Sequence, residues 1–383
     1  MQALAFLDEL IPLYPVYALL FADAGMTGGQ ISVLFGLWSL TAFVLEVPSG
    51  ALADRVPRRH LLVASQVLRA VGFASWVVWP TFAGFALGFV LWGAAGATWS
   101  GTWQAFVYDE LAAHGVADRY VRVVGRAEAL AAGGALVGTV LAAPLIALGG
   151  YALTGWASVA VCLVAAAIAS RLPLPPASDA EDADAEGEAD EGYLATLRAG
   201  VREALRDRAV GRIVLVVVVL SGVTAVEEYF GLLAVDFAVP PVVLPLLLLA
   251  PAVGYAVGAE VGGRLGGLSP RRLAGVVALG GVVFAAGALV PHPAGFVGIA
   301  VGFALLECAI VVAGARLQET LTGPRATVTS VSSVGEEVVA MLVFGVFGVA
   351  SGVVPLSALV ALAVVPVLAV ALRVPRWIPS AAQ

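Results

Sequence analysis

Long apolar stretches separated by short polar segments dominate the chain. A helix that crosses a bilayer needs roughly 20 mostly apolar residues, because each residue adds about 1.5 Å along the axis. The apolar stretches divide into twelve such segments, at about 3–23, 30–53, 60–80, 83–111, 120–148, 152–170, 210–236, 241–265, 273–291, 294–318, 326–350 and 354–372. Gly149-Gly150 predicts the turn between the fifth and the sixth. The pattern therefore predicts an all-α membrane protein with twelve transmembrane helices.

The composition agrees with this prediction. Of the 383 residues, 61% are hydrophobic and only 12% are charged. A water-soluble domain of this length would need more polar surface to cover its core. Cys162 and Cys308 both fall inside predicted spans, so a disulfide scaffold is not supported.

The basic residues predict the orientation. All 20 are arginine, and they gather in every second connection, including Arg58, Arg59, Arg271 and Arg272. By the positive-inside rule those connections are cytoplasmic, which places both termini in the cytoplasm. The arginine-only, Ala- and Gly-rich usage is typical of a high-GC bacterium, so we expect a multi-pass protein of the inner (plasma) membrane.

An acidic tract divides the chain. SDAEDADAEGEADEG, at 178–192, holds eight acids and no base, which is typical of a self-repelling, disordered linker. The segment after it is expected to form a short helix on the cytoplasmic membrane surface. We therefore predict a six-helix bundle at 1–172, a linker with a surface helix at 173–209 and a second six-helix bundle at 210–383.

The two predicted bundles repeat one another. Adding 213 to a position in the first half aligns Asp23 with Asp236, Gly50 with Gly263, and Arg58-Arg59 with Arg271-Arg272, without a gap. Two parallel six-helix repeats are the plan of a secondary transporter whose substrate site lies near the bilayer midplane.

The loop after the second span carries a family signature. Gly50–Arg59 reads GALADRVPRR and resembles the G-x-L-A-D-R-x-G-R-R motif of the major facilitator superfamily, with Pro57 at the second glycine. The resemblance covers essentially the whole chain and implies a monomeric transporter of small molecules with pseudo-symmetric bundles. It also implies a cytoplasmic gate formed by Gly50, Asp54, Arg55 and Arg59 that stabilises the outward-open state.

Two further stretches resemble the efflux branch of that superfamily. Gly125, Gly134 and Gly138 have the spacing of the antiporter pattern of helix five, although Thr139 stands where that pattern has proline. SGTWQAFVYDEL, at 100–111, resembles the end of helix four in drug-efflux-like facilitators. The resemblance implies a proton antiporter.

Acidic side chains inside the predicted spans are candidates for proton coupling or substrate binding. A charge at mid-bilayer costs about 3 kcal/mol or more, so such a group must face water, a partner or a substrate. Burial favours the protonated form of a carboxyl group, which can then bind and release a proton as its access alternates. The candidates are Glu307, Glu227, Glu228, Glu336, Glu337, Glu128, Asp8 and Glu9. Adjacent acids point about 100° apart, so we expect one of each pair to be structural.

Arg69 is the charged residue of the third span. Glu46, on the neighbouring antiparallel span, is expected at a similar depth. We predict a structural ion pair between Glu46 and Arg69, and the alternative is a substrate role for Glu46.

Aromatic residues on the same spans suggest the cargo. A cavity with carboxylates and aromatic faces suits a lipophilic cation, through charge attraction and cation–π contact. The aromatic candidates are Tyr14, Tyr17, Trp38, Trp103, Tyr229 and Phe230. Ordinary packing is the alternative for each of them.

The sequence lacks the residue patterns of several other functions. Without lysine the chain has no Walker A phosphate loop and no Schiff-base lysine. His60, His114 and His292 lie near span ends without metal-ligand spacing, so we expect no metal, no cofactor and no enzymatic activity. Basic residues beyond those that topology requires are few, so we expect no nucleic-acid partner.

The sequence thus predicts a proton-coupled transporter that exports a hydrophobic or cationic small molecule in exchange for protons. The alternative is a symporter that imports a nutrient or metabolite with the same carboxylates. A receptor or a lipid-modifying membrane enzyme is disfavoured, because no catalytic constellation accompanies the acids.

Overall fold

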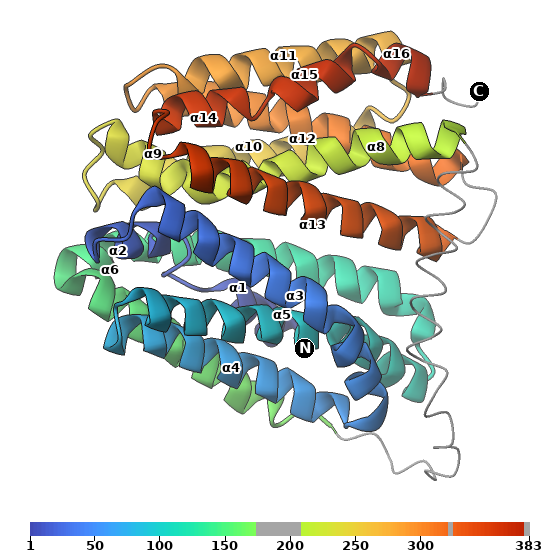
Figure 1. Cartoon of the computed structure of the whole chain (residues 1–383). Helices are drawn as coiled ribbons and strands as arrows, with labels where there is room; N and C mark the ends of the chain where they lie inside the picture. The colour runs from blue at the N-terminus through green and yellow to red at the C-terminus, as the bar shows by residue number, and fades with distance from the viewer. Residues whose placement is uncertain (174–207, 321–324, 379–383) are drawn as a thin grey trace. The chain divides into compact units, whose positions relative to one another are not determined.

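The computed structural model describes residues 1–173, 208–320 and 325–378, and omits the side chains of residues 47, 50, 51, 54, 55 and 325–330. Every regular element in these ranges is helical (Figure 1). Ten helices in the described residues are long and apolar enough to cross a membrane. Most of the predicted acidic linker lies outside the described residues.

The chain divides into two compact units. One contains Met1–Gly192 with Pro241–Pro245, and the other contains Tyr193–Pro240 with Leu246–Gln383. The helices of the first unit are α1 (Gln2–Glu9), α2 (Tyr17–Asp23), α3 (Gly28–Arg55), α4 (Arg58–Val78), α5 (Phe82–Ala113), the short 3₁₀ helix η1 (Ala117–Arg119) and α6 (Tyr120–Ala169).

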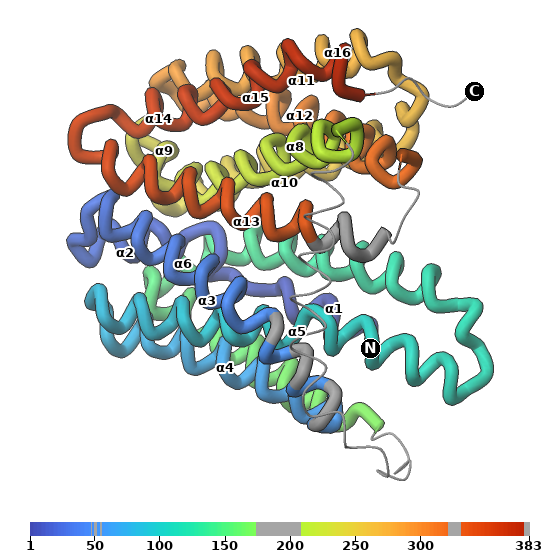
Figure 2. Tube along the Cα trace, turned by 45° about the vertical axis from the view of Figure 1, so that its right-hand side comes forward, coloured from blue at the N-terminus to red at the C-terminus, as the bar shows by residue number. Residues whose placement is uncertain are grey.

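The first predicted span, 3–23, is not one continuous helix. It consists of α1 and α2, joined by a non-helical stretch from Leu10 to Val16 (Figure 2). Pro12 and Pro15 lie in this stretch, and each lacks the amide hydrogen that an α-helix needs at its position. The two prolines therefore explain the break, which the apolar pattern alone did not predict.

The helix α6 contains two of the predicted spans. Its backbone leaves helical geometry at Gly149 and Gly150, where the turn was expected. Gly150 has φ +62°, a left-handed conformation that a residue with a Cβ adopts only with strain. The segment of 53 residues from Ala117 to Ala169 therefore crosses the bilayer twice.

The second unit repeats this plan. Its helices are α8 (Arg208–Val223), the 3₁₀ helix η2 (Thr224–Tyr229), α9 (Phe230–Asp236), α10 (Leu244–Arg264), α11 (Pro270–Ala288), α12 (Gly295–Thr320), α13 (Arg325–Ala350), α14 (Leu356–Leu362), α15 (Val365–Ala371) and α16 (Val374–Trp377).

The break in the first span has a counterpart in the second unit. Adding 213 to the bounds of α2 gives 230–236, which are the bounds of α9. The same shift carries the break at Leu10–Val16 onto 223–229, where η2 interrupts the helix. The seventh span has no proline at this place, and the interruption there is a stretch of tighter helix. Both repeats therefore interrupt their first span at equivalent positions, by different local means.

Helix α6 packs directly against the backbone of the first span. A Cβ at Gly134 would collide with the carbonyl oxygen of Phe6, and one at Gly138 would lie 3.0 Å from the amide nitrogen of Ile11. Small residues at such crossings let transmembrane helices approach closely. These two glycines thus hold the broken helix against α6.

We predict that Gly134→Ala destabilises the protein by about 1–3 kcal/mol, because the new methyl group overpacks the contact with α1. Gly133→Ala is the matched control, since a Cβ there meets open space. Thermal unfolding of the purified protein in detergent would check both variants. Equal unfolding midpoints for the two variants would contradict the close packing of α1 on α6.

Candidate functional site

Asp8 lies at the centre of a buried polar cluster. Arg69 Nη1, from α4, lies 3.0 Å from Asp8 Oδ1 and 2.6 Å from the Asp8 carbonyl oxygen. Gln66 Nε2 donates to Asp8 Oδ1 at 2.6 Å. All three residues are at most 6% exposed. The arginine thus neutralises the carboxylate in a region that excludes water.

The backbone break explains why this cluster forms. In an α-helix the Asp8 carbonyl would accept from the amide of residue 12, but Pro12 has no amide hydrogen. Arg69 supplies the missing donor. Farther along the break, the Leu13 amide donates to Ser158 Oγ of α6 at 3.0 Å. Side chains of α4 and α6 therefore satisfy backbone groups that the prolines expose.

The predicted ion pair between Glu46 and Arg69 is corrected by this arrangement. Arg69 pairs with Asp8, while the exposed Glu46 accepts a hydrogen bond from Ser100 Oγ at 3.3 Å. The prediction rested on the similar depth of the two residues on neighbouring antiparallel helices, and depth does not determine which partner a side chain reaches. Gln66 was missed, although it precedes Arg69 by three residues and therefore lies on the same face of α4.

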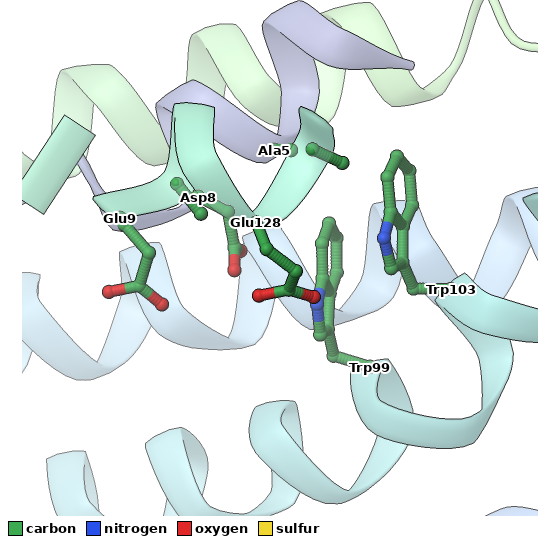
Figure 3. Close-up of a pocket in the computed structure, with 8 residues that line it drawn as sticks. Ala5, Asp8, Glu9, Trp99, Trp103 and Glu128 are labelled. Carbon is green, nitrogen blue, oxygen red and sulfur yellow. The ribbon is translucent and has the colours of Figure 1, made fainter. Parts of the chain in front are cut away.

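A cavity of about 100 Å³ adjoins the cluster inside the first unit. Asp8 and Glu9 line it from α1, Trp99 and Trp103 from α5, and Glu128 from α6 (Figure 3). The two indole rings are stacked, with centroids 5.3 Å apart and planes 8° apart. Figure 3 shows the three carboxylates on one side of the indole pair.

The charges of this cavity favour a cation. It is lined by three carboxyl groups, and the arginine of the cluster makes its ion pair with one of them, Asp8. Indole faces add cation–π attraction to the same ligand. Its volume accommodates a small cationic head group or a few water molecules. Of the predicted residues, the structure thus brings together Asp8, Glu9, Glu128 and Trp103.

The candidate acids of the second unit lie around the interruption of the seventh span. Glu227 and Glu228 are on η2, Glu307 is on α12, and Glu336 and Glu337 are on α13. Glu307 is buried, with an exposed fraction of 6%. The Tyr255 hydroxyl donates a hydrogen bond to Glu307, a partner that the sequence did not predict.

Two further contacts involve the acids of the second unit. The carboxylates of Glu227 and Glu307 are close enough to repel each other. The side chain of Ser221, on α8, forms a hydrogen bond with Glu336 of α13. Among the described ion pairs of this unit, none joins an arginine to the Glu227 and Glu307 carboxylates. The described part of the second unit thus holds Glu227 and Glu307 near each other, and its two arginine ion pairs are made with Glu260 and Glu319.

The aromatic candidates of the first unit other than Trp103 lie in a packed cluster. Tyr17 is buried, and its ring contacts those of Phe21 and Trp76. Tyr14 and Trp38 both stack on Trp92, with centroids 5.0 Å and 4.8 Å from it. These contacts give the three residues a packing role.

The two aromatic candidates of the second unit are packed in the same way. The Tyr229 ring lies 4.2 Å from that of Phe347, measured between centroids. Phe230 lies among three further rings, those of Phe284, Phe296 and Phe303. Both candidates are almost fully buried, so packing also accounts for them.

The signature loop is described only in part. The side chains of Asp54 and Arg55, and the surroundings of Gly50, lie outside what the structure describes. Arg59 Nη1 donates to the Leu172 carbonyl oxygen at 3.2 Å, and Arg58 forms an ion pair with Asp109 at the end of α5. The loop is thereby attached to two other segments of the first unit.

A buried arginine holds the equivalent loop of the second unit. Arg316 of α12 is 1% exposed and donates to the carbonyl oxygens of Gly266 at 2.6 Å and Leu268 at 3.3 Å. It also pairs with Glu319 at 3.0 Å. Sequence reasoning missed this role, because Arg316 has the position expected of one more cytoplasmic arginine.

Comparisons with known proteins agree with the fold. A model of the Major Facilitator Superfamily matches residues 1–355. The chain is similar to the crystal structure of the nucleoside transporter NupG, with a TM-score of 0.75 and 12% identity, over 97% of this chain and 96% of that chain.

It is also similar to an auto-inhibited POT family peptide transporter, with a TM-score of 0.68 and 16% identity, over 98% of this chain and 95% of that chain. A bacterial homologue of the human lysosomal transporter Spinster has a TM-score of 0.66 and 15% identity, over 90% of this chain and 78% of that chain. No curated protein matches the sequence. Likeness at these identities concerns the fold, and it confirms the predicted fold class.

We predict that Arg69→Ala costs about 3–5 kcal/mol of stability, because it leaves the Asp8 carboxylate buried without its partner. Arg58→Ala is the matched control on the same helix, and its more exposed ion pair contributes about 1 kcal/mol or less. Unfolding midpoints would compare the variants. The double variant Asp8→Ala with Arg69→Ala should be less destabilising than the sum of its single changes, and additive effects would contradict the pair.

Proposed function

The chain belongs to the major facilitator superfamily, and on this premise we propose that it exports a hydrophobic or cationic small molecule in exchange for protons. It is a multi-pass membrane transporter of that superfamily. Transporters built from repeated bundles expose a midplane site alternately to the two sides of the membrane. Coupling to protons would then need a group that changes its protonation as its access changes.

The observation that carries the proposal is the acidic cavity between α1, α5 and α6. Its carboxylates outnumber the one arginine beside them, which favours a cationic cargo and disfavours an anion. The stacked pair of Trp99 and Trp103 offers an apolar and π-rich face to the same ligand. A lipophilic cation satisfies both requirements.

Proton coupling is assigned to the acids of the second unit. Glu307 is buried beside Tyr255 and near Glu227. Protonation of one of the two carboxylates removes the repulsion between them, so proton binding and release change the local energy. Glu228, Glu336 and Glu337 are the further candidates.

The proposal also covers the topology, the moving bundles, the cytoplasmic gate and the oligomeric state. We assign both termini to the cytoplasm of a bacterial cell, and we expect the bundles 1–172 and 210–383 to move as bodies during transport. Gly50, Asp54, Arg55 and Arg59 form the cytoplasmic gate. Arg59 also attaches this loop to the end of the sixth span, by donating to the Leu172 carbonyl oxygen. The transporter works as a monomer.

We predict that the purified protein in proteoliposomes moves lipophilic cations when a pH gradient is imposed. Glu307→Gln should remove the dependence of transport on the pH gradient, because the amide cannot bind and release a proton. The measurement is uptake of each cation of a panel, with the gradient in either direction. Glu260→Gln is the control, since this carboxylate is exposed and pairs with Arg264 at the end of α10.

The possible results separate the alternatives. If proton-driven transport survives Glu307→Gln, the coupling site is assigned to Glu227, Glu228, Glu336 or Glu337 instead. If no cation moves under either gradient, the export proposal fails, and import of a nutrient with protons becomes the hypothesis to test.

A further inference from the structure

Asp8 and Glu9 are adjacent at the break in the first span, but their surroundings differ. Asp8 is 6% exposed and binds Arg69 and Gln66, whereas Glu9 is more exposed than Asp8 and pairs with neither of them among the described contacts. Both contribute to the wall of the cavity. Their positions in the sequence alone did not distinguish them.

Asp8 is held through both its carboxylate and its backbone. Arg69 Nη1 reaches the carboxylate and the carbonyl oxygen of this one residue. The carbonyl is available because Pro12 cannot donate to it. A single guanidinium group therefore fixes the end of α1 at the point where the helix stops.

Glu9 is the last residue of α1 and follows this anchor directly. Its own carbonyl oxygen accepts from the Ile11 amide at 2.8 Å, which starts the non-helical stretch. Ser158 holds the other side of the break through the Leu13 amide. The direction of the Glu9 side chain is thus set between two contacts, one with α4 and one with α6.

We propose that Arg69 is a positioning residue that holds Asp8 as a structural anchor and so leaves Glu9 as the acid that meets the cargo. This inference rests on the proposed function as far as the cargo is concerned. Arg69 acts through Asp8 and the backbone, and does not itself line the cavity. Glu128 and the indole pair complete the cargo site together with Glu9 (Figure 3).

Labelling with dicyclohexylcarbodiimide tests the division between the two acids in the unaltered protein. The reagent adds to protonated carboxyl groups in apolar surroundings, and mass spectrometry locates the adduct. We expect Glu9 to be labelled and Asp8 to stay unlabelled, because Arg69 and Gln66 occupy the Asp8 carboxylate and cover it from the reagent. Benzyltrimethylammonium at about ten times its Kd should slow the labelling of Glu9 about tenfold, in proportion to the free fraction.

Variants test the role of Arg69. Arg69→Gln should make Asp8 reactive and weaken the affinity for benzyltrimethylammonium about tenfold, because the end of α1 that carries Glu9 loses its anchor and the site is no longer preorganised. Arg69→Lys should restore the protection of Asp8. Arg58→Gln is the control, because it removes an ion pair from the loop end of the same helix.

A second pair of variants covers the case in which Arg69→Gln does not fold. Ser158→Ala removes the acceptor of the Leu13 amide, and it should weaken binding of the same cation without exposing Asp8 to the reagent. Ser65→Ala is its control, because this buried serine donates to the Ala95 carbonyl oxygen instead.

The inference is overturned if Asp8 is labelled and protected like Glu9 in the unaltered protein, or if Arg69→Gln keeps both the unlabelled Asp8 and the original affinity. Failure of the proposed function looks different. In that case no cation moves in proteoliposomes and benzyltrimethylammonium protects neither acid, while the contrast between Asp8 and Glu9 and its dependence on Arg69 remain.

Discussion

A backbone carbonyl group in the interior of a membrane protein must find a hydrogen-bond donor, and the first span depends on how one such group is satisfied. Pro12 leaves the Asp8 carbonyl without its helical donor, and Arg69 replaces it. The arginine in turn needs a counter-charge, which the Asp8 side chain supplies. The close approach of α6 at Gly134 and Gly138 then holds the rest of the segment in place.

The apolar pattern was sufficient for the fold class, because hydrophobic length is a local property. The turn at Gly149-Gly150 was also predictable, since glycine tolerates the left-handed conformation found there. The repeat was visible as a constant shift of 213 positions. These features depend on residues that are close in the sequence or copied within it.

The partners of the buried charged residues were harder to predict from the sequence. The sequence placed Glu46 and Arg69 at similar depth on adjacent helices, but depth does not say which way a side chain turns. Pro12 and Pro15 were the signal that could have revealed the break, and with it the exposed carbonyl that attracts Arg69. Trp103 was found among the aromatic candidates, whereas Tyr17 is packed in a core that any apolar ring could fill.

The two repeats interrupt their first span at equivalent positions, but only the interruption in the first unit is imposed by proline residues. Proline forbids the α-helical bond in the first unit, whereas η2 consists of residues that an α-helix accepts. Rewinding one residue from 3₁₀ to α geometry turns the following side chains by about 20° and shortens the axis by about 0.5 Å. Glu227 and Glu228 therefore lie on a segment in which a change of helix type couples rotation of the side chains to a shift along the helix axis. Asp8 and Glu9 lie beside a break that proline keeps open.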